Sequence, residues 1–181
     1  MMKIFVLSLT LSLAAITAPC QSPDPTPSSA PPPTAHVVNT IRFEVAAPMS
    51  RVAPMFAPEA ERAWAGKEWN PVFLYPQPGR DVQGAVWTTQ HGPFTIWVNT
   101  LFDVPAGHME YVATIVEHMV ITIDVVVTAL APARTAVEVT FTRTALNPAA
   151  NDGVRAEGEN DRTSGPEWQQ GVEAGLGLTK K

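Results

Sequence analysis

Between residues 84 and 146, apolar and polar residues alternate in one segment after another, and this pattern constrains the fold more than any other feature. The clearest segment is residues 118–130, where the residues on one side are Met119, Ile121, Ile123, Val125 and Val127. Such alternation is typical of a strand with one dry and one wetter face. The same reasoning predicts strands at residues 84–90, 93–104, 108–116 and 135–146. Because short turns join these segments, the sequence predicts an antiparallel meander.

Before the meander, residues 37–45 alternate well enough to predict one more strand. Residues 49–56 place apolar side chains on one helical face, but Pro54 limits this stretch to short helical pieces. Pro58 is suited to the first turn of another short helix.

After the meander, residues 147–164 are polar and contain glycine, which predicts a long loop. Trp168, Val172 and Leu176 then repeat every four residues and predict a last helix with one apolar stripe. Ser164 and Glu167 have the spacing of a capping box at its start. Together these elements predict an α+β fold in which the last helix covers the apolar face of the sheet. An apolar hollow between them is the default place for a small ligand.

The N-terminus has the pattern of a secretory signal peptide over residues 1–20: a short basic start and an apolar run too short to span a bilayer comfortably. Cys20 is the only cysteine, and its position resembles a bacterial lipoprotein lipidation site, although Pro19 and Thr17 depart from that pattern. Ordinary cleavage near Ala18 or Cys20 is the alternative. Residues 21–36 form a Pro/Ser-rich linker, which places the folded domain at residues 37–178. We therefore expect export to the periplasm or beyond, with a possible membrane anchor through Cys20.

Charge and motifs narrow the function classes. The net charge is −5 and there is no basic run, which argues against nucleic acid and anionic membrane surfaces as partners. Membrane contact is expected only through the N-terminal lipid anchor. The four histidines lack metal-ligand spacing, and no nucleophile elbow is present. No metal and no cofactor is therefore expected.

Several segments resemble the SRPBCC superfamily, the START-like and polyketide-cyclase-like helix-grip proteins. The most telling are residues 61–71, "ERAWAGKEWNP", and residues 144–147, "TALN". The resemblance covers nearly all of residues 37–178. It implies an antiparallel sheet of about seven strands around a C-terminal helix, with a cavity between them. A short, glycine-rich last helix and a long polar stretch before it depart from the family pattern.

The resemblance places Trp64 and Trp69 near the mouth of that cavity, where they would stack on a ligand. Packing at the end of the sheet is the favoured alternative. Tyr111 lies on the inward face of its strand and could present its hydroxyl to a ligand or satisfy a hydrogen bond in the core. We expect Glu61 and Glu68 to be solvated charges at helix ends.

Phe141 and Arg143 belong to the inward set of the last strand and complete the candidate ligand-binding residues. An inward arginine could bind a ligand carboxylate or phosphate bidentately. It could instead pair with Asp103 or Glu110. Catalytic residues remain unassigned.

These features favour an exported module that holds an apolar, lipid-like or polyketide-like molecule between the sheet and the C-terminal helix. The alternative is a cyclase or dehydratase that uses acid–base groups in the same cavity. A protein-interaction module, as in the chaperone-activator branch of the superfamily, fits an exported chain least well.

Overall fold

The structure, a computed structural model, describes residues 33–89 and 93–179. The predicted signal peptide, Cys20 and most of the Pro/Ser-rich linker lie outside the described residues. No helix among the described residues is long and apolar enough to cross a membrane.

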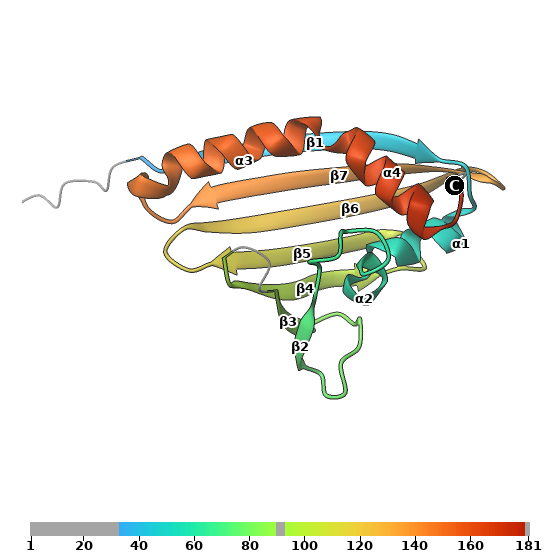
Figure 1. The fold of residues 1–181 in the computed structure, drawn as a ribbon, viewed down its shortest axis with the longest axis horizontal. Coiled ribbons are helices and arrows are strands. Elements are labelled where there is room, and N and C mark those ends of the chain that lie inside the picture. Colours follow the sequence, from blue (N-terminus) through green and yellow to red (C-terminus); the bar gives the residue numbers. More distant parts are fainter. Residues whose placement is uncertain (1–32, 90–92, 180–181) are drawn as a thin grey trace, which may run out of the picture. The chain divides into compact units, whose positions relative to one another are not determined.

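Seven antiparallel strands form one sheet in the order β1-β7-β6-β5-β4-β3-β2 (Figure 1). Their bounds are β1 His36–Val45, β2 Val72–Tyr75, β3 Val86–Thr89, β4 Thr95–Asp103, β5 His108–Ile115, β6 Met119–Ala131 and β7 Arg134–Ala145. The predicted α+β fold, the first strand and the five-strand meander are confirmed. The short β2 was missed because Pro71 and Pro76 flank it closely and leave too few residues for a visible alternation.

The long strands β6 and β7 supply the floor of the core, with the inward face that alternation predicts. Met119, Ile121, Val125 and Val127 of β6 are all buried. Ile123 belongs to the same set and yet is only half-buried. The reason is that Ile123 faces an open cavity rather than packed side chains. The incomplete burial of Ile123 on the inward face of β6 therefore marks the position of the cavity.

Three short helices connect β1 to β2: α1 Met49–Val52, the 3-10 helix η1 Ala53–Phe56, and α2 Pro58–Glu61. Val52, Ala53 and Phe56 are buried, as the predicted helical face requires. Pro54 and Pro58 occupy first-turn positions, where a missing N–H costs no hydrogen bond. The prediction of short helical pieces is confirmed.

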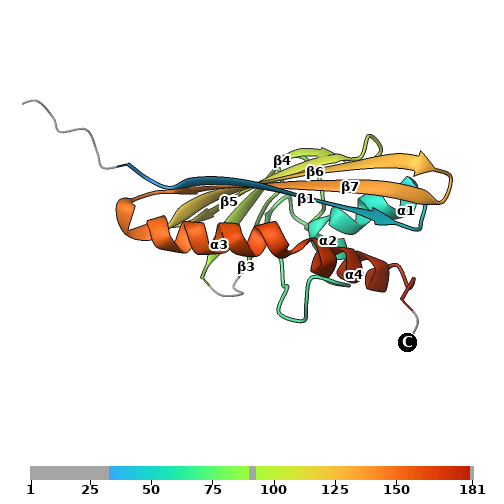
Figure 2. The same cartoon turned by 90° about the horizontal axis from the view of Figure 1, so that it is seen from above.

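The chain ends with the 3-10 helix η2 Pro148–Ala150, then α3 Asn151–Thr163 and α4 Gly165–Gly175. Figure 2 shows α3 and α4 on one face of the sheet. The predicted loop over residues 147–164 was wrong, because most of it is α3. This helix is too polar to show a clear apolar stripe. Its buried residues are Val154, Gly158 and Asp161; Gly158 lies against Val37 and Asn39 of β1, and Asp161 pairs with Arg143 of β7. The polar stretch that departs from the family pattern is therefore part of the helical cover.

The predicted capping box was also wrong. The Ser164 hydroxyl donates to the Asp161 carbonyl oxygen at 2.9 Å instead of capping α4. Because α3 runs almost directly into α4, Ser164 already has helical backbone angles and finishes the first helix.

Candidate functional site

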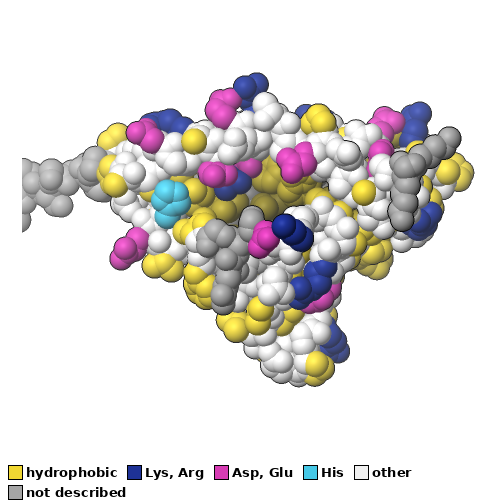
Figure 3. Space-filling view, viewed as in Figure 1, with side chains coloured by type: hydrophobic (Ala, Val, Ile, Leu, Met, Phe, Trp, Pro, Cys, Tyr) yellow, Lys and Arg dark blue, Asp and Glu magenta, His cyan; other side chains and the backbone are white. Residues whose placement is uncertain are grey.

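A cavity of about 340 Å³ lies between the sheet, α4 and the segment that follows α2. Its volume falls in the range of small-molecule sites, roughly 300–1,000 Å³. Figure 3 shows a hollow on this side of the molecule with hydrophobic side chains on its floor. The lining residues are Pro58, Glu61, Trp64, Ala65, Gly66, Trp69, Trp87, Trp97, Tyr111, Ile123, Val125, Glu167 and Trp168. All five tryptophans of the chain are among them.

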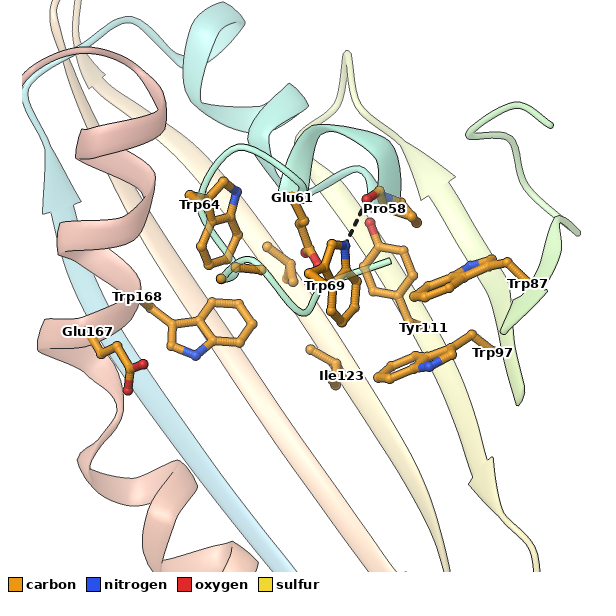
Figure 4. Close-up of a pocket in the computed structure, with 13 residues that line it drawn as sticks. Pro58, Glu61, Trp64, Trp69, Trp87, Trp97, Tyr111, Ile123, Glu167 and Trp168 are labelled. Carbon is orange, nitrogen blue, oxygen red and sulfur yellow. Dashed lines mark hydrogen bonds between the residues drawn. The ribbon is translucent and has the colours of Figure 1, made fainter. Parts of the chain in front are cut away.

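The tryptophans form two groups (Figure 4). Trp64 and Trp168 meet edge to face, with ring centroids 5.4 Å apart. Trp87 and Trp97 stack in parallel at 4.9 Å, and Trp69 packs edge-on against both rings. Such pairs contribute about 0.5–1.5 kcal/mol each beyond the area they bury. The aromatic wall is therefore held in place by its own packing.

Hydrogen bonds fix the two tryptophans that precede β2. The Trp64 indole N–H donates to the Met55 carbonyl oxygen at 2.7 Å, and the Trp69 N–H donates to the Pro58 carbonyl oxygen at 3.0 Å. In contrast, the Trp168 indole N–H has no hydrogen-bond acceptor among the residues that the structure describes. Trp64 and Trp69 line the cavity, and their role in ligand binding stays a prediction.

Hydrogen bonds also fix the tryptophans on β3 and β4: the Trp97 indole N–H donates to the Thr89 hydroxyl at 3.1 Å, and Trp87 bonds to a buried amide. Asn99 is fully buried, and its side-chain oxygen accepts from the Trp87 indole N–H at 2.8 Å. Its amide nitrogen donates to the Val82 carbonyl oxygen at 3.2 Å. Alternation over residues 93–104 does not tell which face of β4 is inward, because Trp97 lies on one side and Ile96 and Val98 on the other. The structure places Trp97 and Asn99 on the inward face.

Glu61, the last residue of α2, directs its carboxyl group into the cavity between Trp64 and Trp69 (Figure 4). No hydrogen bond reaches this carboxyl from any of the described residues. Burial raises the pKa of Glu61 well above its usual range, and the nearby Asp81 carboxylate raises that pKa further. Glu61 therefore keeps its proton at pH values where a surface glutamate is ionised. The expectation of a solvated charge was wrong for this residue.

Tyr111 on β5 also lines the cavity, with its ring as the available surface. Its hydroxyl donates to the Phe56 carbonyl oxygen at 2.5 Å, which ties β5 to η1. Burial is the main reason that the pKa of Tyr111 lies far above its usual value. The hydroxyl already donates its hydrogen bond to Phe56 and does not readily lose its proton, so it is unsuited to proton transfer.

The other two candidate residues do not line the cavity. Arg143 points inward, as alternation predicts, but its guanidinium group donates to both carboxylate oxygens of Asp161, at 2.6 and 2.7 Å. Its partner is neither Asp103 nor Glu110. Phe141 is buried behind the cavity and packs edge-on against Trp168, with centroids 5.4 Å apart. Phe141 supports the cavity wall, and Arg143 joins β7 to α3.

Sequence reasoning missed Trp87, Trp97, Trp168 and Glu61 as cavity residues. The first two could have been found together, because Trp87 and Trp97 pair directly across β3 and β4. The regular spacing of Trp168 identified its helix but not the cavity that it faces. No local signal distinguishes Glu61 from any other acid at a helix end.

No cluster of metal-ligating side chains exists within the described parts of the chain. The imidazole and carboxylate that do meet are His108 and Asp124, 2.7 Å apart on neighbouring strands. His118 lies against α3 near Gly153.

Three solved structures illustrate what this chain is similar to. The norcoclaurine synthase of Thalictrum flavum, in complex with dopamine and hydroxybenzaldehyde, matches with a TM-score of 0.55 and 12% identity, over 82% of this chain and 91% of that one. An Hsp90 activator from Plasmodium falciparum matches with a TM-score of 0.56 and 16% identity, over 80% and 99%. An uncharacterised protein from Rhizobium leguminosarum matches with a TM-score of 0.54 and 18% identity, over 78% and 97%.

No family model matches the sequence, and no curated protein matches it either. Identities this low show a shared fold and nothing finer. The curved sheet with its C-terminal helical cover is the helix-grip fold, which agrees with the resemblance to the SRPBCC superfamily.

Proposed function

We propose that this domain binds a compact, largely apolar small molecule in the tryptophan-lined cavity. The observation that carries the proposal is the convergence of all five tryptophans on one hollow, from α4, two strands and the segment after α2. A chain that needed these rings only for stability would pack them against each other without leaving about 340 Å³ open.

The cavity is also prepared for a ligand before one arrives. Trp64 and Trp69 are fixed by hydrogen bonds to backbone carbonyl oxygens, so a ligand need not order them. Rings that are already ordered reduce the entropic cost of binding. Norcoclaurine synthase, which shares the fold, is known in complex with dopamine and hydroxybenzaldehyde, two small ring compounds. We propose ligands of that size rather than long lipid chains, because the cavity is at the small end of the usual range.

Binding is favoured over the cyclase or dehydratase alternative by the polar groups of the cavity. Proton transfer through a substrate needs an acid and a base that converge on it. Glu61 is one such group, but the Tyr111 hydroxyl is engaged by Phe56, and Arg143 by Asp161. We include export, with possible anchoring through Cys20, in the proposal as the setting in which the domain works.

The test uses N-phenyl-1-naphthylamine, a neutral fluorescent probe of compact size. The wild-type domain should bind it with a blue-shifted, enhanced emission. Ile123→Phe puts a larger ring on the floor of the cavity, where the body of the ligand would lie, and should weaken binding at least tenfold. Val38→Phe, the same kind of change at an exposed position of β1, is the matched control and should bind like the wild type. Equal binding by both variants would place the probe elsewhere and contradict the proposal.

A further inference from the structure

The ionisable side chains that line the cavity are all acidic. They are Glu61, Glu167 and Tyr111, whose hydroxyl is already hydrogen-bonded to Phe56. No Lys, Arg or His is among the lining residues. Glu167 lies on α4 at the exposed rim, whereas Glu61 projects into the hollow itself. Glu61 is half-buried, and its carboxyl group has no hydrogen-bond partner among the described residues, so its free oxygens face the cavity and are available to a ligand.

The aromatic lining offers a second interaction with the same preference. The face of an indole ring attracts a cation within about 6 Å of the ring centroid. Figure 4 shows Trp64, Trp168 and Trp69 around the space next to Glu61. Aromatic cages completed by a carboxylate are the arrangement by which proteins recognise substituted ammonium groups. An uncharged apolar ligand would use the rings and leave Glu61 unexplained.

We propose that the ligand of this cavity is an organic cation, a compact ring compound that carries an amine or quaternary ammonium group against Glu61 and the indole faces. This inference rests on the proposed binding function and names its ligand class. The apolar body of such a ligand would occupy the space over Ile123 and Trp97, and its charged end would face α2.

Proton release follows from this arrangement. In the empty cavity burial, and to a lesser extent Asp81, raise the pKa of Glu61, so that its protonated form persists to a higher pH than that of a surface glutamate. A bound cation reverses that preference, so Glu61 releases its proton to solvent and remains as the carboxylate of an ion pair. The other acidic groups that face this region are Asp81 before β3, Tyr111 on β5 and Glu167 on α4. Affinity for the cation should rise with pH, up to about tenfold per pH unit below the pKa of Glu61, and should level off above it.

The experiment compares phenyltrimethylammonium with tert-butylbenzene, its neutral isostere, by quenching of tryptophan fluorescence. We expect the cation to bind at least tenfold more tightly at pH 8, with a preference that shrinks as the pH is lowered. Calorimetry of cation binding in two buffers with different ionisation enthalpies, at a pH where the affinity still rises with pH, should show release of a proton.

Glu61→Gln keeps the shape of the side chain and removes its charge, so it should abolish the proton release and reduce the preference for the cation to what the indole faces alone supply. Glu68→Gln, a nearby exposed acid, is the matched control and should change neither. Binding of N-phenyl-1-naphthylamine checks that the Glu61→Gln cavity is intact. Should that variant not fold, proton release by the wild type decides the question alone.

Equal binding of the cation and its isostere, or tighter binding without proton release, would overturn this inference and leave the binding function standing. Failure of all three probes to bind would refute the binding function and the ligand class together. The two failures are therefore distinguishable in the same set of titrations.

Discussion

Removing one partner of the ion pair between Arg143 and Asp161 should destabilise the domain strongly. The side chains are only 12% and 7% exposed, and two hydrogen bonds of 2.6 and 2.7 Å join them. Arg143→Met leaves the Asp161 carboxylate buried without its counterion. A buried charge left in this way costs about 3–5 kcal/mol. This is a large share of the roughly 5–15 kcal/mol that stabilises a domain of this kind.

The double variant Arg143→Met/Asp161→Leu removes both charges and should recover most of the loss, because a buried pair contributes little net stability over apolar replacements. Urea unfolding followed by tryptophan fluorescence measures each free energy of unfolding. The matched control is Arg42→Met, which breaks a 2.7 Å pair with Glu138 on the same sheet. Those side chains are 68% and 44% exposed, so its cost should stay below about 1 kcal/mol.

Two results would refute this reasoning. One is a cost for Arg143→Met no greater than for Arg42→Met, which would mean that water reaches the pair. The other is additivity of the two single changes in the double variant, which would mean that each residue acts independently. Probe binding should survive Arg143→Met in the folded protein, because Arg143 does not line the cavity.

Two further changes test the cavity acid and the helical cover. The raised pKa of Glu61 means that folding binds a proton, so its stabilising effect is complete below the usual glutamate pKa and is lost as pH rises through the folded pKa. Glu61→Gln should remove this decline, at most about 1.4 kcal/mol per pH unit, in urea titrations from pH 4 to 9; an unchanged decline would contradict it. Gly158→Ala would place a Cβ 2.5 Å from Val37 Cγ1 and should cost about 1–3 kcal/mol in the same assay. Gly165→Ala is the control and should be neutral, because the new Cβ would lie no closer than 3.7 Å to any neighbour. Equal free energies of unfolding for the two variants would mean that β1 shifts to make room for the new methyl group and would contradict the prediction.

The strands could be predicted because the relevant forces are local. The inward residues of β6 and β7 follow from a period of two, and that period needs only one partly buried face. The short helices before β2 follow from Pro54 and Pro58 in the same way. Helix α3 was not predicted, because the close contact at Gly158 and the ion pair of Asp161 hold it on the sheet and no apolar stripe marks it in the sequence.

The candidate site was predicted in part. Trp64, Trp69 and Tyr111 line the cavity, whereas Arg143 and Phe141 do not. The direction of Arg143 followed from alternation, but its partner lies on a helix that the sequence did not reveal. Trp87 and Trp168 are 81 positions apart in the sequence, and only the folded chain brings them to one hollow.

The sequence alone determined most of the sheet, the inward faces of β6 and β7 and the presence of a covering helix, since periodicity and proline positions act over a few residues. Only the tertiary structure decided where the interior stays open and which charges enter it. The environment of Glu61 shows why. Its pKa depends on burial by residues distant in sequence and on Asp81, twenty positions away, and no local pattern contains that information.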